Sequence, residues 1–341
     1  MPANLSPEYK AAEAAYRATR DPRARLDGLR EMLRTIPKHK GTERLQADLK
    51  ARIKELSEAL EAPRKGAGHG APSHVVHREG AAQIALLGAP NAGKSLLHAR
   101  LTGSSAHDAP YPFTTQHPEP GMMPYADIHF QLVDLPAVSA EHPVPWLAGT
   151  LQTADAALLV VDLADTDDID QLAAVQDVLR ARRVTLTPRW NDDDAAPVQA
   201  TAGDDDPLMV RLPALLVANH CDRVRDPDAE LAALRELAQF PYPALAVSAA
   251  TGHGLGDLGP WLFRSLGIVR VYTKAPGKPP DHGRPFTLQR GQTVRELARL
   301  VHKDLERSLR FARVWGHSGF DGQHVGADHA LADGDIVELH T

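Results

Sequence analysis

Residues 83–95 read QIALLGAPNAGKS and decide the fold. The first part, residues 83–87, is apolar after its glutamine and predicts a buried strand. The second part has the G-x-x-x-x-G-K-S spacing of a phosphate loop, with Gly88 and Gly93 bracketing the turn. The backbone N–H groups of such a turn surround phosphate oxygens at the positive end of the helix that follows. The stretch therefore predicts a strand, a phosphate-binding turn and a helix in succession.

The residue types in this turn match the chemistry of a nucleoside triphosphate. Lys94 would place its ammonium on the β- and γ-phosphates, and Ser95 would give its hydroxyl to Mg²⁺. We expect the nucleotide to be contacted here by Gly88, Asn91, Ala92, Gly93, Lys94, Ser95 and Leu96.

The surrounding pattern predicts an α/β domain over residues 81–267. Further strand-like runs lie at 128–133, 157–161, 214–218 and 244–247, and helical patterns lie between several of them, at 169–182 and 228–239. Alternation of this kind is typical of a mostly parallel sheet covered on both faces. Residues 188–213 interrupt it with two runs of three aspartates and several prolines, which favour a solvated insertion over a carboxylate metal site.

Two polar motifs downstream of the loop suit a metal ion. Thr114 and Thr115 lie in an expected loop, where one threonine can coordinate Mg²⁺ when a γ-phosphate is present. Asp134 ends an expected strand and can reach Mg²⁺ through water. The metal set expected from the sequence is therefore Ser95, a loop threonine and Asp134.

Two later motifs suit a guanine base. Asn219 and Asp222 follow another strand, at the edge of the sheet where a base would sit. Asp222 can accept from the N1–H and the N2 amino group of guanine, a donor pattern that adenine lacks. Ser248, Ala249 and Ala250 would close the base pocket. Each motif is weak alone, but their shared order predicts a guanine-nucleotide site.

The first 65 residues predict a helical hairpin. Ser6 followed by Pro7 is typical of a helix start. A helical stripe is formed by Leu45, Leu49, Ile53, Leu56 and Leu60. By count the segment holds 15 Lys and Arg against 10 Asp and Glu, which fits a solvated face and an RNA-contacting surface equally well. Residues 66–80, rich in Gly, Ala and His, predict a linker.

The C-terminal residues 268–341 predict a small mixed α+β unit. Strand-like runs lie at 269–273, 311–315 and 336–339, and Thr293 is a typical cap for a helix between them.

Composition limits the class of protein. The 341 residues are 43% hydrophobic with a net charge of −6, which argues for a multi-domain globular chain and against a wholly basic nucleic-acid binder. One cysteine, Cys221, excludes an intramolecular disulfide and a multi-cysteine metal site. The N-terminal residues lack the apolar core of a signal peptide, and no apolar run approaches the length of a membrane span, so we expect a cytoplasmic protein with no membrane partner.

The motifs together resemble the Obg/DRG group of translation-factor-related GTPases. Tyr111-Pro112-Phe113-Thr114-Thr115 is similar to that group's switch I signature, in which Thr115 serves Mg²⁺. Residues 37–42, Pro-Lys-His-Lys-Gly-Thr, resemble the helical N-terminal segment of the DRG branch. Residues 270–274, 302–305 and 314–316 look like its C-terminal TGS domain, a β-grasp fold. The glycine-rich N-terminal domain of Obg is absent, so the DRG branch fits better.

The resemblance implies slow GTP hydrolysis with Mg²⁺, with Lys94 and Thr115 as the catalytic residues. It also implies association with ribosomes or RNA. We further expect a regulatory protein among the partners and no DNA. The alternative is a non-hydrolysing adaptor that holds guanine nucleotide. An ATPase of the related TGS-containing branch is disfavoured, because that branch has glutamate at the position of Asp222.

Three positions depart from the pattern or bear on rate. Ala137 replaces a family glycine whose N–H contacts the γ-phosphate, and alanine restricts the φ/ψ change of the switch. His220 replaces a lysine whose stem packs over the base, so an imidazole could stack there instead. Val138 stands where Ras-like enzymes place a water-orienting glutamine, which implies slow hydrolysis. Finally, Asn91 resembles the asparagine that supports a K⁺ ion in related GTPases, although it also suits a plain turn.

Overall fold

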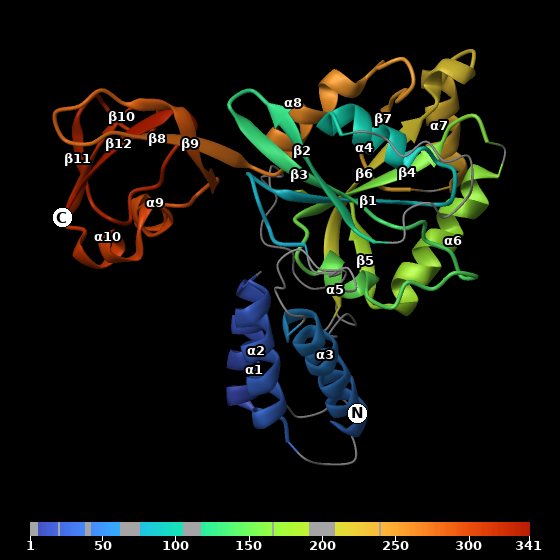
Figure 1. Cartoon of the computed structure of the whole chain (residues 1–341), viewed down its shortest axis with the longest axis horizontal. Helices are drawn as coiled ribbons and strands as arrows, with labels where there is room; N and C mark the ends of the chain where they lie inside the picture. Colours follow the sequence, from blue (N-terminus) through green and yellow to red (C-terminus); the bar gives the residue numbers. More distant parts are fainter. Residues whose placement is uncertain are drawn as a thin grey trace, which may run out of the picture.

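The computed structural model of the chain describes residues 6–19, 21–37, 42–61, 76–104, 117–165, 167–190, 209–238 and 240–341. They form an N-terminal helical unit, a central α/β domain and a C-terminal unit with its own sheet (Figure 1). The fold class expected from the sequence is confirmed: the central sheet is mostly parallel and the C-terminal sheet is separate. None of the helices in these ranges is long and apolar enough to cross a membrane.

The central sheet has the strand order β2-β3-β1-β4-β6-β5. Strand β5 pairs with the first half of β6, and β7 pairs with its second half. Only β2 runs antiparallel, against β3. The bounds are β1 Gln83–Gly88, β2 Glu119–Tyr125, β3 Ile128–Asp134, β4 Ala156–Asp162, β5 Val184–Thr187, β6 Val210–Asn219 and β7 Ala244–Ala246. Because β1, β3, β4 and β6 are parallel, their carboxyl ends meet at one edge, where the expected site motifs lie.

Helices cover both faces of this sheet, as the alternation of its side chains requires. One face packs against α4 (Lys94–Thr102) and α8 (Leu255–Ser265); the other packs against α5 (Leu147–Leu151), α6 (Asp168–Ala181) and α7 (Pro227–Ala238). In β1, Ala85 and Leu87 enter one core while Ile84 and Leu86 enter the other. Strands buried on both faces read as continuous apolar runs, which is why β1 was recognisable from sequence.

Two features of the sheet differ from the sequence expectation. The strand-like runs expected from the sequence do not include residues 119–125. Strand β2 forms there although it contains Pro120 and Pro124, because it is an edge strand, where proline is tolerated. Residues 210–213 belong to β6 and pair in parallel with β5, so the stretch expected as an insertion overlaps this strand. Both aspartate runs of that insertion, at 192–194 and 204–206, lie outside the described residues.

The N-terminal unit has three helices in the described residues rather than the two of a hairpin: α1 Pro7–Ala18, α2 Pro22–Thr35 and α3 Glu43–Glu61. Ser6 caps α1 as expected. Asp21 caps α2 by accepting from the Ala24 N–H at 2.8 Å, and Pro22 takes its first position, so a second helix begins directly after the first ends. A core of Tyr9, Ala12, Tyr16, Leu29, Met32, Ile36 and Leu49 joins the three.

The C-terminal unit is a five-stranded sheet in the order β11-β10-β12-β8-β9. Its elements are β8 Ile268–Thr273, β9 Asp281–Gln289, α9 Val294–Val301, α10 Lys303–Ser308, β10 Phe311–Trp315, β11 Gln323–Val325 and β12 Asp335–His340. Thr293 caps α9 in a capping box with Glu296, so the expected cap is confirmed. Val294 and Leu297 of α9 enter the apolar core of this sheet.

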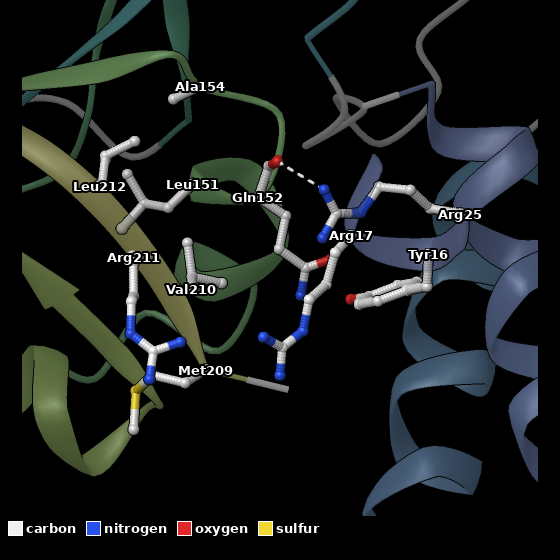
Figure 2. A pocket seen from close by; sticks show the side chains of 10 residues that line it. All are labelled: Tyr16, Arg17, Arg25, Leu151, Gln152, Ala154, Met209, Val210, Arg211 and Leu212. Carbon is white, nitrogen blue, oxygen red and sulfur yellow. Dashed lines mark hydrogen bonds between the residues drawn. The ribbon is translucent and has the colours of Figure 1, made fainter. Parts of the chain in front are cut away.

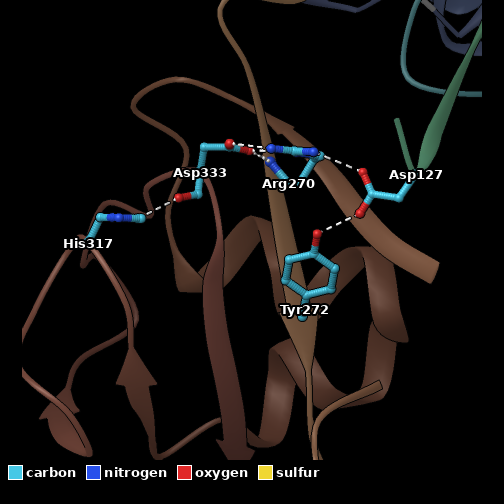
Figure 3. Close-up of polar contacts among 5 residues, drawn as sticks. All are labelled: Asp127, Arg270, Tyr272, His317 and Asp333. Carbon is cyan, nitrogen blue, oxygen red and sulfur yellow. Dashed lines mark hydrogen bonds and ion pairs between the residues drawn. The ribbon is translucent and has the colours of Figure 1, made fainter. Parts of the chain in front are cut away.

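The C-terminal unit is tied to the central sheet through the β2–β3 turn. Asp127 of that turn accepts from Arg270 Nη1 at 3.0 Å and from the Tyr272 hydroxyl at 2.5 Å (Figure 3). The same guanidinium binds Asp333 of its own unit, with Nη2 to Oδ2 at 2.7 Å. The Asp333 carbonyl oxygen lies 2.9 Å from His317 Nδ1, from which it can accept a hydrogen bond. One arginine therefore joins the two domains.

Candidate nucleotide site

The phosphate loop leaves β1 with backbone angles that select its residues. Gly88 has φ 153°, and a Cβ there would lie 2.3 Å from the Val160 carbonyl oxygen. Gly93 has φ 83° and caps α4, with Asn91 at φ 63° before it. Asparagine tolerates the left-handed region better than most residues. The turn therefore directs the first N–H groups of α4 towards the carboxyl edge of the sheet, where they suit an anion.

Lys94 is buried beside this turn. Its ammonium donates to the Ala89 carbonyl oxygen at 2.8 Å. Burial lowers the pKa of Lys94 to about 8, and the nearby Asp134 charge opposes that shift. A desolvated ammonium held by a neutral carbonyl is well prepared to exchange that contact for a phosphate oxygen.

Ser95 and Asp134 meet although they are 39 residues apart. The Ser95 hydroxyl donates to Asp134 Oδ2 at 2.6 Å, at the start of α4 and the end of β3. Asp134 is fully buried. A hydroxyl and a carboxylate are hard oxygen ligands of the kind Mg²⁺ prefers, so these two residues fit a magnesium ion. The third expected ligand, Thr115, and its neighbour Thr114 lie outside the described residues.

Asn219 joins the phosphate loop to the loop expected to hold the base. Its side chain is buried at the end of β6, donates to the Ala92 carbonyl oxygen at 3.1 Å and accepts from the Ala249 N–H at 3.0 Å. A Cβ on Gly93 would lie 2.2 Å from the Asn219 amide nitrogen, so glycine is required for this approach. The structure thus brings three separate sequence motifs into one cluster.

The side chain expected to read guanine, Asp222, is exposed next to this cluster. Asp222 lies on the surface in a short 3₁₀ turn, Cys221–Arg223. A hydrogen bond from Ser248 is the main cause that lowers the pKa of Asp222, so the carboxylate is ionised and oriented. Ser248 and Ala249 are buried, and Ala250 is exposed beside them. An oriented carboxylate at this edge can accept two N–H donors from one face of a base.

His220 lies against the phosphate loop rather than in solvent. It has φ 61° and is 6% exposed. Its Nδ1 lies 2.8 Å from Asp162 Oδ2, and its Nε2 would lie 3.2 Å from a Cβ on Gly93. The imidazole therefore fills the space between the end of β4 and the phosphate loop, beside the position where the base would sit.

Ala137 and Val138 are both buried in the loop after β3. The Val138 N–H donates to the Gly88 carbonyl oxygen at 3.1 Å, which holds this loop against the phosphate loop. Ala137 does not occupy a positive φ, so alanine is accommodated here without backbone strain.

Sequence reasoning missed two residues that shape the site. Arg100, on α4, donates to the Ala249 and Ala250 carbonyl oxygens at 3.1 and 2.8 Å and fixes the base loop to the helix of the phosphate loop. Asp162 ends β4 directly opposite Asn219 of β6 and pairs with His220. Asp162 could have been predicted from its position at the end of an apolar run. Nothing in the sequence indicates the role of Arg100, because its partners lie about 150 residues away.

Two family models match separate parts of the chain. Residues 83–188 match the model described as 50S ribosome-binding GTPase, and residues 269–341 match the TGS domain. The first match contains the phosphate loop, Asp134 and the sheet from β1 to β5. The second coincides with the C-terminal unit.

Curated relatives match over nearly the full length. An uncharacterized GTP-binding protein of Halobacterium salinarum is 28% identical over 92% of this chain and 97% of its own. Developmentally-regulated G-protein 2 of Arabidopsis thaliana is 29% identical over 91% of this chain and 88% of its own. Among solved structures, a GTP binding protein from Pyrococcus horikoshii has a TM-score of 0.49 at 17% identity, covering 76% of this chain and 99% of that one.

Proposed function

Since this chain belongs to the Obg/DRG type of GTP-binding proteins, with a P-loop GTPase domain followed by a TGS domain, we propose that it is a slow, Mg²⁺-dependent GTPase switch of the cytoplasm that associates with ribosomes or RNA. The observation that carries the nucleotide part is the position of Asn219, whose side chain bonds to the phosphate loop and to the base loop at once. That arrangement spaces a phosphate cradle and a guanine-reading carboxylate on one edge of the sheet.

Each site residue has a role in this proposal. Lys94 and the N–H groups at the start of α4 hold phosphate oxygens. Ser95 and Asp134, with Thr115, would hold Mg²⁺, which supplies positive charge against the phosphates. Asp222, oriented by Ser248, selects guanine. With Asn219 and Arg100 already bonded, the base loop needs little further ordering when nucleotide binds.

The expectation of slow turnover follows from the loop after β3. Val138 provides no polar side chain to orient a water, and its N–H is engaged with Gly88. The loop must release that bond before its backbone can turn towards a γ-phosphate. Ala137, with less φ/ψ freedom than glycine, makes the movement harder.

The adaptor is the second candidate, and the buried loop of Ala137 and Val138 favours it. In that case the chain binds guanine nucleotide and its partner without hydrolysis. The family description of a 50S ribosome-binding GTPase supports a ribosomal partner under either candidate.

The first experiment measures affinity and turnover of the purified chain with GTP, GDP and ATP in Mg²⁺. Guanine-selective binding with slow phosphate release supports the switch, and turnover that rises on addition of ribosomes supports the partner. Binding without turnover, even with ribosomes, selects the adaptor. Failure to bind guanine nucleotide would refute both.

The proposed contact between Asp222 and the guanine base is tested by the variant Asp222→Asn. Asp222→Asn should weaken GDP binding by about 100-fold or more, because the carboxamide cannot accept both guanine donors. The same variant should gain affinity for xanthosine diphosphate, which offers an acceptor where guanine offers its amino group. Unchanged base preference in Asp222→Asn would place the base elsewhere.

The role of Asn91 is tested with monovalent cations. We expect faster GTP hydrolysis in KCl than in NaCl, and loss of that difference in Asn91→Gly, which keeps the left-handed backbone but removes the amide. Equal rates in both salts with the natural chain would assign Asn91 to the turn alone.

A further inference from the structure

His220 has a backbone conformation that its neighbours must hold in place. It has φ 61°, in the left-handed region, and it stands between β6 and the short turn Cys221–Arg223 that carries Asp222. A residue with a side chain rarely adopts this region, and the contacts around it must compensate for the strain. The surroundings of the imidazole therefore bear on the direction in which Asp222 points.

The carboxylate of Asp162 faces this imidazole from the neighbouring strand. Asp162 ends β4 opposite Asn219 of β6, and its Oδ2 lies 2.8 Å from His220 Nδ1. The contact is electrostatic rather than an aligned hydrogen bond, since Nδ1 makes no hydrogen bond within the described residues. Oδ1 of the same carboxylate accepts from the Ala164 N–H at 3.0 Å, so the group is fixed before any ligand binds.

The phosphate loop closes another side of the ring. His220 is buried, and its Nε2 would lie 3.2 Å from a Cβ on Gly93. The imidazole thus has little room to turn away from Asp162 while Gly93 keeps its place. A ring held between a carboxylate and a loop fixes the backbone from which the next turn starts.

The turn that carries Asp222 is built on this backbone. The His220 carbonyl oxygen accepts from the Arg223 N–H at 2.9 Å, which closes the turn around Asp222. Asp222 is exposed and receives a hydrogen bond from Ser248. Because little else surrounds an exposed side chain, the direction of this carboxylate depends largely on the backbone of the turn.

We propose that Asp162 is a positioning residue for guanine selectivity, acting through His220 on the direction of Asp222. The inference rests on the proposed function, because the contact between Asp222 and guanine is itself proposed. Two N–H donors on one edge of a base need both carboxylate oxygens in line with that edge, whereas a single donor tolerates a rotated carboxylate. Loss of Asp162 should therefore weaken binding of guanine more than binding of hypoxanthine, which lacks the N2 amino group.

The test compares GDP with IDP, whose base is hypoxanthine, by calorimetry of the full chain in Mg²⁺. The two nucleotides share their phosphates, ribose and N1–H, so the ratio of their dissociation constants isolates the contact to the N2 amino group. The variant is Asp162→Asn, which keeps an oxygen for the Ala164 N–H and removes the negative charge. Thermal unfolding of the same samples detects loss of the fold, which would lower both affinities together.

Two matched variants address the charges near Asp162. Asp165→Asn changes an acid of the same loop, whose carboxylate accepts from the Asp167 N–H and the Gln171 amide. Arg223→Gln removes the exposed guanidinium that lies 3.9 Å from Asp162 Oδ2. Neither should change the ratio of GDP to IDP affinity by more than about twofold, because neither alters the contact with His220.

A third control loosens the opposite end of β4. Gln152, shortly before this strand, is held from α2 by Arg25, whose Nη1 donates to the Gln152 carbonyl oxygen at 3.1 Å. The bond lies beside a cavity of about 250 Å³ between the N-terminal helices and the central domain (Figure 2). Arg25→Gln should lower thermal stability and leave the ratio unchanged, which separates general loosening of the domain from loss of positioning at the carboxyl end of β4.

We expect Asp162→Asn to raise the Kd for GDP about tenfold and the Kd for IDP less than about twofold. Glycine adopts the left-handed region without strain, so in a His220→Gly background the same change should alter the ratio less than about twofold. Equal losses for GDP and IDP, no loss for either, or an undiminished effect in His220→Gly would overturn the inference while GDP still binds the natural chain. A natural chain that fails to bind GDP would overturn the proposed function and this inference with it.

Discussion

Lys94 links the chemistry of the phosphate loop to pH. Burial already lowers its pKa to about 8 in the free protein, and a bound phosphate would raise that pKa again because it favours the charged form. Its contribution to binding is therefore complete below pH 8 and is lost as the pH rises from 8 towards the pKa of the complex.

We accordingly expect the dissociation constant for GDP to be flat from pH 6.5 to 8 and to rise by up to about tenfold per pH unit above that. The measurement is a fluorescence titration with labelled GDP up to pH 9, below the ionisation of the base. Lys94→Arg serves as control, since its guanidinium stays charged and any remaining affinity should not depend on pH. A flat profile to pH 9 in the natural chain would contradict the expectation.

The sequence predicted those candidate site residues that lie within short motifs. The spacing from Gly88 to Ser95 located Lys94, and strand ends located Asp134 and Asn219. Arg100 could not be predicted because its hydrogen-bond acceptors are backbone carbonyl oxygens, which every residue has. They also lie in a loop about 150 residues away. Such contacts exist only once the sheet brings the loops together.

At the scale of elements, helix α4 is flanked at both ends by a capping glycine in the left-handed region. Gly93 has φ 83° and Gly103 has φ 71°. They differ in surroundings: a Cβ on Gly93 would collide with Asn219, whereas a Cβ on Gly103 would have no atom within 4 Å. Gly93 is therefore needed both for its left-handed backbone and for its close approach to Asn219, whereas Gly103 is needed for its left-handed backbone alone.

Gly103→Ala should therefore cost about 1 kcal/mol of unfolding free energy, the strain of a left-handed alanine, with GDP affinity unchanged. Gly93→Ala should cost at least about 2 kcal/mol more, because Asn219 must give up buried hydrogen bonds, and GDP affinity should fall by about 100-fold. Urea unfolding and GDP titration of both variants provide the measurement. Similar losses in the two would mean that Asn219 is not the constraint.

The elements that could be predicted from sequence are those with a strong periodic pattern. Buried β1 and β4 and the amphipathic α9 are of this kind. Strand β2 carries two prolines and, among the described strands, pairs with β3 alone, so its existence depends on a partner strand rather than on its own residues. Helix α2 begins at a local cap, Asp21 followed by Pro22, directly after α1 ends, so the described part of the N-terminal unit has three helices where the sequence predicted a hairpin.

At the scale of the whole molecule, Asp127 connects the C-terminal unit to the hairpin that leads into the site. That hairpin, β2–β3, ends at Asp134, which contacts Ser95. Desolvation raises the pKa of Asp127, but hydrogen bonds from Tyr272 and Arg270 outweigh it, so the net shift is downward and the carboxylate is ionised at neutral pH. We therefore expect a movement of either domain to be transmitted to the other through Asp127.

Asp127→Asn should reduce the unfolding free energy by about 1–2 kcal/mol, since it weakens two hydrogen bonds to a partly buried charge. Hydrogen exchange should rise in β8 and in the β2–β3 turn together. The control is Asp328→Asn in the C-terminal unit, whose ion pair with Arg295 is exposed and should contribute less than about 0.5 kcal/mol. Faster exchange confined to one side of the contact would show that the domains are not coupled through Asp127.

The junction between these domains has a consequence for proteases. Helix α8 ends at Ser265 and β8 begins at Ile268, and the two residues between them are both hydrogen-bonded: the Leu266 N–H to Leu262, and Gly267 to Arg264 and Arg290. A protease needs an extended stretch of free chain, and this junction offers none. Cleavage there requires one of the domains to unfold first. We therefore do not expect the C-terminal unit to appear as a stable fragment in partial digests. The rate at which a protease cuts this junction then measures how readily the two joined domains unfold.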